Sequence, residues 1–209
     1  NFVFTQQTPA KKQTQDILIH NAFIHIGNGT LIENGSIVFS EGQIKYVGNN
    51  IIEEDALPLL YSEKKIKTID ANGSHIYPGF IAINSTLGLV EIDAVRASDD
   101  EDEIGEFLPN IRSAIAYNAE SKIVESVRPN GVLIAQITPR GGTISGSSSV
   151  MQLDAWNWED ALIKTDEGIH MNWPSPYSRG RWWLGEDPSL KENKDYLKSI
   201  HSIESFFNQ

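Results

Sequence analysis

Residues Pro78–Gly88 read PGFIAINSTLG, and the interpretation of the whole chain depends on this stretch. A Pro-Gly pair precedes the apolar run Phe80–Ile83, and three small polar residues, Asn84–Thr86, end the run. A short apolar run bounded by turn residues is typical of a buried strand. The stretch therefore predicts a strand that carries polar side chains to its carboxyl end, which is where binding sites are built in α/β folds.

The composition of the 209 residues excludes several classes of function. The net charge of -11 repels phosphate groups, so neither nucleic acid nor an anionic membrane surface is an expected partner. No apolar run approaches the about 18 residues that a membrane-spanning helix needs. The chain has no cysteine, which excludes disulfides, thiolate nucleophiles and thiolate zinc ligands.

Residues 1–15, NFVFTQQTPAKKQTQ, begin with an apolar triplet and then turn polar, which predicts a flexible N-terminus. Two interpretations of this start remain open. It is either the end of a signal peptide, which together with the lack of cysteine indicates a periplasmic or secreted protein, or an arbitrary boundary in a cytoplasmic protein.

Residues 16–77 predict a small antiparallel, β-sandwich-like module. Apolar residues alternate along residues 16–26, and NGT follows as a turn. Two short runs, Ser36–Ser40 and Gln43–Val47, flank Glu41-Gly42 and predict a hairpin. Further strands are expected on both sides of the turn at Asn72-Gly73.

After Pro78 the pattern of the sequence changes to alternating strands and helices, so that the chain as a whole is of the α/β class. The apolar run Gly131–Pro139 predicts a strand covered on both faces. The other elements expected are a helix over residues 121–128 with Ser121 as N-cap, a strand over residues 149–154, a helix over residues 157–165, a strand over residues 168–174, an irregular linker over residues 175–188, and a helix from residue 189 with Ser189 as cap.

The segment Thr138–Ser149, TPRGGTISGSSS, contains four candidate site residues, namely Arg140, Gly141, Gly142 and Ser145. Backbone N–H groups in such a loop line an anion or carbonyl site, or the segment is simply a flexible βα connection. Both interpretations stay open. The segment is not a P-loop, because it lacks the Gly-Lys-Ser/Thr sequence that follows the glycines there.

Among the five histidines, His170 is the candidate for a site, because the strand predicted around it aims it at a pocket. No pair forms His-x-His and none forms HExxH. The acidic run Asp99–Glu103 lacks the spacing of an EF-hand and predicts a solvated, mobile loop.

Four segments in order resemble the start of the amidohydrolase superfamily, especially its imidazolonepropionase-like members: Ile32–Gly35, Gly42–Gly48, Ile69–Gly73 and Pro78–Ile81. The resemblance covers roughly residues 16–174. It implies a composite β-sandwich domain beside a TIM-like (β/α) barrel, of which residues 78–209 are the N-terminal part. It also implies hydrolysis of non-peptide C–N bonds, in cyclic amides, imides or dipeptides, by one or two divalent metals such as zinc.

Alignment through Pro78–Ile81 places Asn84 and Thr86 where the family has the two histidines of its first metal half-site, and Ala82 where it has an aspartate. Amide and hydroxyl oxygens are weak ligands compared with imidazole, so the resemblance implies a degenerate site that holds no metal in this chain. Glu91 and Arg96 follow this strand and are further candidates for the pocket, and no catalytic residue is assigned.

The segment of residues 76–209 is shorter than a closed barrel, which needs about 200 residues. A C-terminal portion or a partner chain is therefore expected to complete the fold, as a homo- or hetero-oligomer in the second case.

Two functions follow from the resemblance. The chain is part of a metal-dependent amidohydrolase acting on a small amide-type substrate, and is inactive by itself, or it is a non-catalytic binding or assembly subunit with that fold. A carbohydrate-binding β module is disfavoured, because the tryptophans lie outside residues 16–77.

Overall fold

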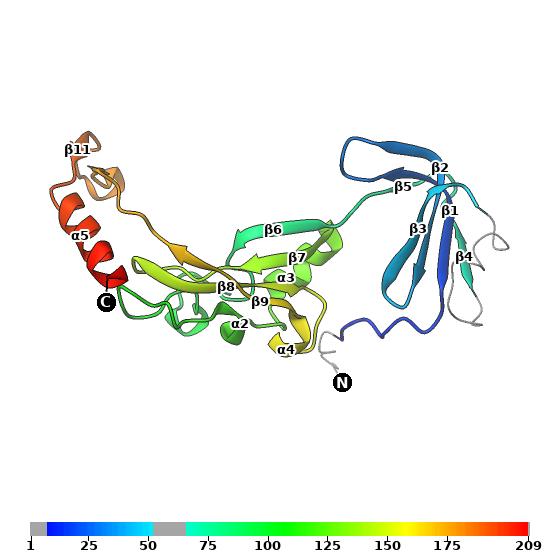
Figure 1. Ribbon diagram of the computed structural model, residues 1–209, viewed down its shortest axis with the longest axis horizontal. Helices are drawn as coiled ribbons and strands as arrows, with labels where there is room; N and C mark the ends of the chain where they lie inside the picture. Colours follow the sequence, from blue (N-terminus) through cyan, green and yellow to red (C-terminus); the bar gives the residue numbers. More distant parts are fainter. Residues whose placement is uncertain (1–7, 52–65, 209) are drawn as a thin grey trace. The chain divides into compact units, whose positions relative to one another are not determined.

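A computed structural model describes residues 8–51 and 66–208. The chain divides into two compact units, Asn1–Phe80 and Ile81–Gln209 (Figure 1). Residues 1–7 of the predicted flexible N-terminus lie outside the described residues. Within residues 8–15, Gln13 bonds to the first unit: its side-chain N–H donates to the Phe39 carbonyl (3.1 Å), and its side-chain oxygen accepts from the Gly42 N–H (2.7 Å).

The first unit is built on a five-stranded sheet with strand order β3-β2-β1-β4, in which β5 also pairs with β1. The strands are β1 (Ile17–His25), β2 (Leu31–Ser40), β3 (Gln43–Asn49), β4 (Lys67–Asp70) and β5 (His75–Ile76). The neighbours β1/β2 and β2/β3 are antiparallel, whereas β4 and β5 run parallel to β1. The prediction of an antiparallel module was therefore wrong for β4 and β5, because both strands pair with β1 in the parallel direction.

The predicted hairpin around Glu41-Gly42 is confirmed as the β2–β3 turn. Both turn residues have positive φ (53° and 73°), as a tight hairpin turn requires. Leu18 and Val38 form one small core cluster on the sheet, and Ala22, Ile24 and Ile37 form another. The described residues of this unit thus hold one sheet, and no second β layer is found among them.

The second unit is built on a four-stranded sheet with the order β6-β7-β8-β9 (Figure 1). The strands are β6 (Phe80–Ser85), β7 (Val132–Ile137), β8 (Ile144–Gln152) and β9 (Leu162–Met171). The carboxyl ends of β6 and β7 lie together, because the Thr138 N–H donates to the Ser85 carbonyl over 2.8 Å. These two strands therefore run in the same direction.

Strand β8 runs antiparallel to both of its neighbours, β7 and β9, which differs from the parallel arrangement expected of a (β/α) barrel. A parallel connection needs about 12 residues or more, and residues 138–143 are too few for one. The chain turns back at Gly141 and Gly142, whose φ angles are 77° and 54°. The second half of the Gly/Ser-rich segment, residues 144–149, is therefore part of strand β8, and the flexible βα connection is excluded.

The core of the second unit covers one face of this sheet. Ala135, Ile137, Met151 and Leu153 are fully or almost fully buried there. Three short helices contribute residues to this core or lie next to it: α2 (Ser113–Ala116), α3 (Lys122–Val127) and α4 (Trp158–Ala161). The expectation that β7 is covered on both faces was wrong for the described residues, because burial alternates along the strand and Leu133 is 52% exposed.

The helix boundaries follow local side-chain bonds. Ser121 caps α3 as predicted, since its hydroxyl accepts from the N–H groups of Ile123 and Val124. The helix expected over residues 157–165 ends at Ala161, because the following residues, rich in β-branched side chains, pair with β8 instead.

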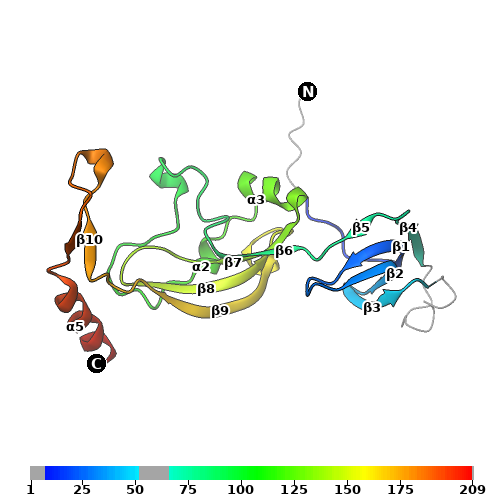
Figure 2. The same cartoon turned by 90° about the horizontal axis from the view of Figure 1, so that it is seen from above.

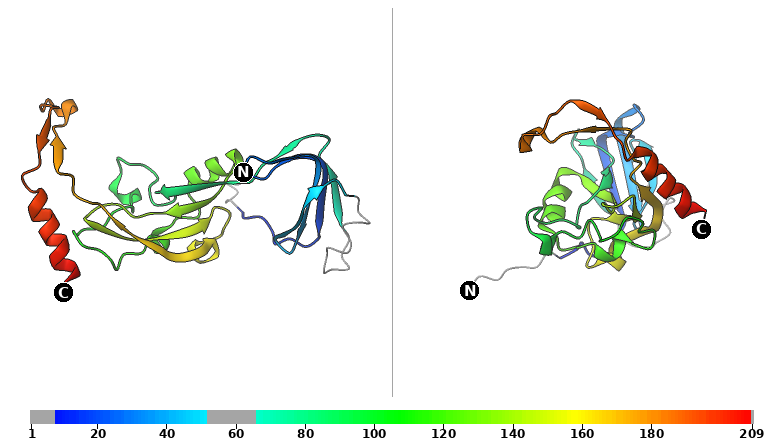
Figure 3. Two further views of the ribbon diagram at one scale, coloured as in Figure 1. Left: turned by 45° about the horizontal axis from the view of Figure 1, so that its top comes forward. Right: turned by 90° about the vertical axis from the view of Figure 1, so that its left-hand side faces the viewer.

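The C-terminal part contains more regular structure than predicted (Figure 2). The segment expected to be an irregular linker contains β10 (Tyr177–Arg179), which pairs with β11 (Leu190–Glu192), and a 3-10 turn at Trp182–Leu184. The last helix, α5 (Tyr196–Phe207), begins seven residues after the predicted cap, Ser189. The Ser189 hydroxyl donates to Asp187 and does not cap a helix. The Asn193 side chain accepts from the Asp195 N–H just before α5. Figure 3 shows this hairpin and α5 beyond one end of the four-stranded sheet.

Gly146 in β8 provides a test of this arrangement. Its φ is +124°, and a Cβ added there would lie 2.6 Å from the Ile111 carbonyl oxygen. That oxygen accepts the N–H of Ser147 over 2.8 Å, so Gly146→Ala is expected to detach residues 111–116 from β8. Hydrogen exchange of the full-length protein should show faster exchange in residues 111–116 and 144–150.

Gly168→Ala on the paired strand β9 is the matched control, because no atom lies within 4 Å of its added Cβ. Equal exchange in the two variants would show that Ile111 does not bind β8 as described.

Candidate functional site

The candidate site lies at the adjacent carboxyl ends of β6 and β7, where Arg140 binds Asn84. One Arg140 guanidinium nitrogen, Nη1, donates to the Asn84 side-chain oxygen over 2.6 Å, and the other, Nη2, donates to the Asn84 backbone carbonyl over 2.7 Å. The two residues are far apart in the sequence, and both are candidates from the sequence. The structure therefore brings the degenerate ligand position and the Gly-rich segment into one site.

The backbone of Asn84 has a special conformation, with φ of +51°. Asparagine tolerates this left-handed region better than most residues. Its N–H donates to the Gln136 side chain (3.2 Å), and the Gln136 amide donates to the Ser148 hydroxyl (3.2 Å). A row of polar contacts therefore crosses β6, β7 and β8 beside the Arg140–Asn84 pair.

His170 belongs to the same region. It lies on β9 opposite Gly146 and is partly buried. Burial lowers its pKa, and the positive charge of Arg140 lowers it further. The imidazole is therefore neutral at pH 7, and it lies close enough to Arg140 to respond to its charge.

The remaining candidates of the Gly-rich segment form a tight turn beside the pair. The Ser145 hydroxyl donates to the Gly141 carbonyl (2.6 Å), and the Asn172 amide donates to the carbonyls of Gly141 (3.2 Å) and Gly142 (2.9 Å). A Cβ on Gly142 would lie 2.9 Å from the carbonyl oxygens of Gly105 and Glu106, so only glycine fits. Asn172 escaped prediction, because nothing in GIHMNWP indicates a partner on another strand.

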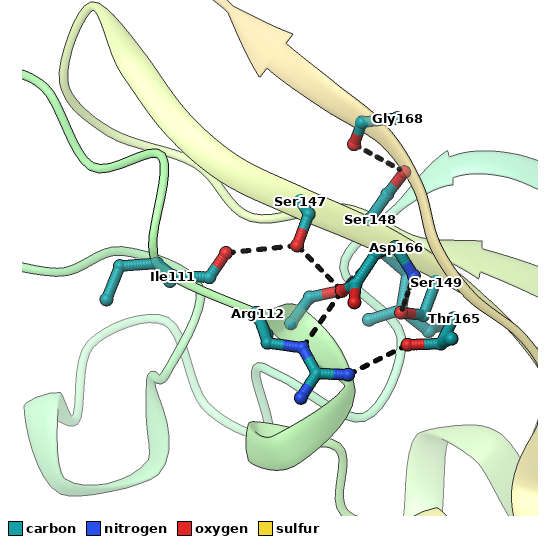
Figure 4. Close-up of polar contacts among 10 residues, drawn as sticks. Ile111, Arg112, Ser147, Ser148, Ser149, Thr165, Asp166 and Gly168 are labelled. Atoms are coloured by element: carbon teal, nitrogen blue, oxygen red, sulfur yellow. Dashed lines mark hydrogen bonds and ion pairs between the residues drawn. The ribbon is translucent and has the colours of Figure 1, made fainter.

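The serines of β8 bond within the protein rather than to a ligand (Figure 4). Asp166 on β9 accepts from the Ser147 hydroxyl (2.9 Å) and from Arg112 Nε (3.0 Å), and Arg112 also donates to the Thr165 hydroxyl (2.8 Å). The Ser149 hydroxyl accepts from the Asp166 N–H (3.2 Å). This network, called the Asp166 network below, fastens the segment before α2 to strands β8 and β9.

The other predicted site residues lie outside this set. Glu91 accepts from the Asn118 amide (3.1 Å), Arg96 pairs with Asp102 (2.7 Å), and the backbone carbonyl of Thr86 accepts from the Leu89 N–H (2.9 Å). Among the described residues, no hydrogen bond joins Glu91, Arg96 or Thr86 to the Arg140 side chain. The structure therefore does not group them with Asn84 through direct contacts.

The acidic run Asp99–Glu103 is solvated as expected, with three of its five residues exposed, but its backbone is bound to this site. The Arg140 N–H donates to the Glu101 carbonyl over 2.6 Å, and Asp99 forms a bridge with Val90. Burial and the neighbouring Asp99 raise the pKa of Glu101, and the charge of Arg140 opposes this rise in part. A carboxyl group therefore lies in the surroundings of Arg140 without forming a salt bridge within 4 Å.

The donor set at this strand end does not fit a divalent metal. The side-chain oxygen of Asn84 already accepts a hydrogen bond from a cation, and that cation would repel a metal ion at the same atom. Over the ranges 8–51 and 66–208, no group of three or more His, Cys, Asp and Glu side chains is arranged to hold a metal.

Comparison with solved structures gives a fold neighbour. The crystal structure of an amidohydrolase from Thermotoga maritima MSB8 matches with a TM-score of 0.65 and 23% sequence identity, covering 76% of this chain and 39% of that chain. The chain thus has an amidohydrolase-like fold and spans well under two thirds of the length of this neighbour. No protein-family model and no curated protein matches the sequence.

In the part of the chain that the structure describes, no helix is long and apolar enough to cross a bilayer.

The Asp166 network predicts a pH dependence. Hydrogen bonds from Arg112 and then Ser147 lower the pKa of Asp166. A lowered folded-state pKa stabilises the fold above the unfolded value of about 3.9, and this contribution is lost as the pH falls through the folded-state pKa. Hydrogen exchange of residues 111–116 should therefore be slower in the wild type than in Asp166→Asn at pH 6, and the two should converge as the pH falls through the lowered folded-state pKa of Asp166.

Asp93→Asn is the control, because Asp93 is exposed and has no hydrogen bond among the described residues. A difference between wild type and Asp166→Asn that persists unchanged at the lowest pH would contradict the role of the carboxylate.

Proposed function

We propose that this chain is part of an amidohydrolase-like protein whose β6 end binds a small polar ligand without a metal ion. In this proposal the lineage is the imidazolonepropionase-like branch, whose enzymes hydrolyse non-peptide C–N bonds with a divalent metal. The first metal half-site is replaced here, and the chain acts as a binding or assembly subunit. The amidohydrolase-like fold supports the amidohydrolase part of this proposal, and the branch rests on the sequence resemblance alone.

One observation carries the proposal: the guanidinium of Arg140 binds both oxygens of Asn84. A metal hydrolase needs an ion that holds a water, lowers its pKa and polarises the substrate carbonyl. A guanidinium supplies positive charge and donors, but it has no lone pair and no open coordination position. It can orient an oxygen of a ligand, and it cannot generate a bound hydroxide.

A second candidate function follows from how little of the neighbouring structure is matched. The match covers 39% of that chain, so the rest of the fold has no counterpart here. In that case the protein is an active hydrolase on an amide-type substrate, and all its metal ligands come from a C-terminal portion or a partner chain that completes a TIM-like barrel. The exposed apolar side chains of Ile81 (61% exposed) and Ile83 (76%) on β6 support such a covering. A periplasmic or secreted location, with a cytoplasmic one as alternative, belongs to both proposals.

The test compares metal content and turnover in the full-length protein. Wild type, the double variant Asn84→Ala/Thr86→Ala and the control Asn118→Ala are stripped of metal and then incubated with zinc or manganese. Equal metal content in all three is expected, because Asn84 and Thr86 hold no ion. Hydantoin, dihydrouracil and an N-acyl dipeptide serve as substrates, and no metal-dependent turnover is expected.

Each other outcome decides against part of the proposal. Loss of about one ion in the double variant alone would show that this strand end is a metal site. Metal-dependent turnover that survives the double substitution would favour the second candidate.

A further inference from the structure

Arg140 has hydrogen-bonding capacity that the described residues do not use. A guanidinium carries five N–H donors in a planar fork. Two of them donate to the side-chain and backbone oxygens of Asn84, which fixes the plane of the group. Within residues 8–51 and 66–208, the other three donors have no acceptor. An arginine held in one orientation with donors to spare is prepared for an acceptor from outside the chain.

The charge of Arg140 is also left without a close partner. Four other arginines pair with a carboxylate within 4 Å, namely Arg96, Arg112, Arg128 and Arg181. In the described part of the chain, no salt bridge of that length involves Arg140, although it is partly buried. Burial makes an unpaired charge costly, and an external anion would offset that cost.

The positive charge of Arg140 acts on two titratable groups, the imidazole of His170 and the carboxyl group of Glu101. His170 lies on β9 opposite Gly146, and burial, followed by the charge of Arg140, lowers the pKa of its imidazole. The charge of Arg140 opposes the rise that burial and Asp99 cause in the pKa of Glu101, so this carboxylate is expected to compete with an incoming anion.

We infer that Arg140 is the fixed cation of this site and binds the carboxylate of a small ligand through the edge of its guanidinium that faces away from Asn84. This inference rests on the proposed metal-free binding site. A carboxylate fits because its two oxygens match two parallel N–H donors, which gives a bidentate pair. A neutral amide of the same shape has one acceptor oxygen and forms a weaker contact. The ligand class is therefore a small carboxylic acid.

The test uses benzoate and benzamide, which have nearly the same size and differ in charge. Saturation-transfer difference NMR with the full-length protein measures the affinity of both. Benzoate is expected to bind the wild type, and Arg140→Gln is expected to weaken it by about 10- to 100-fold, as for the loss of a charged hydrogen bond. Benzamide is expected to bind the wild type as weakly as benzoate binds Arg140→Gln.

Three further variants separate recognition from folding. Arg140→Lys keeps the charge and loses the fork, so an intermediate affinity is expected. Glu101→Gln removes the competing carboxylate and is expected to tighten benzoate binding. Arg179→Gln changes an exposed arginine of β10 and is expected to have no effect.

Equal benzoate affinity in wild type and Arg140→Gln, or equal affinity of the wild type for benzoate and benzamide, would overturn the inference. Absence of benzoate binding to the wild type would overturn it as well. These failures can be told apart from failure of the proposed function. The proposed function fails if the Asn84→Ala/Thr86→Ala variant loses bound metal, and that result does not depend on benzoate binding.

Discussion

The pair of hydrogen bonds from Arg140 to Asn84 determines the character of the strand end on which the candidate site is built. It joins the carboxyl ends of β6 and β7, which already meet through the Thr138 N–H and the Ser85 carbonyl. Both bonds come from a charged donor and are therefore stronger than bonds between neutral groups. The pair occupies the oxygen of Asn84 that would face a metal, and it places a positive charge beside it.

The surrounding structure supports this arrangement through the antiparallel return of β8. The tight turn at Gly141 and Gly142 brings β8 back along β7, and Asn172 at the end of β9 binds the carbonyls of that turn. Arg140 is therefore held between the turn and the backbone of Glu101. On the covered face, the Asp166 network binds the segment before α2 to the same two strands.

The local features of this fold were readable from the sequence. The Glu41-Gly42 hairpin, the Ser121 cap and the polar end of the strand in PGFIAINSTLG depend on neighbouring residues, and the structure has all three. The burial expected of that strand was wrong for the described residues, because Ile81 and Ile83 on β6 are 61% and 76% exposed. The contact between Arg140 and Asn84 joins residues of different strands, so periodicity gives no signal for it. TISGSSS has the composition of a loop, yet it forms a buried strand, because its hydroxyl groups bond to neighbouring strands and segments instead of to water.

A crystal structure of the full-length protein, grown with zinc and measured at the zinc absorption edge, tests the nature of this strand end most directly. The expected map shows the Arg140 guanidinium bound to both oxygens of Asn84 and no anomalous peak beside them. A zinc peak about 2.0–2.2 Å from the Asn84 side-chain oxygen, with Arg140 turned away, would contradict a metal-free site.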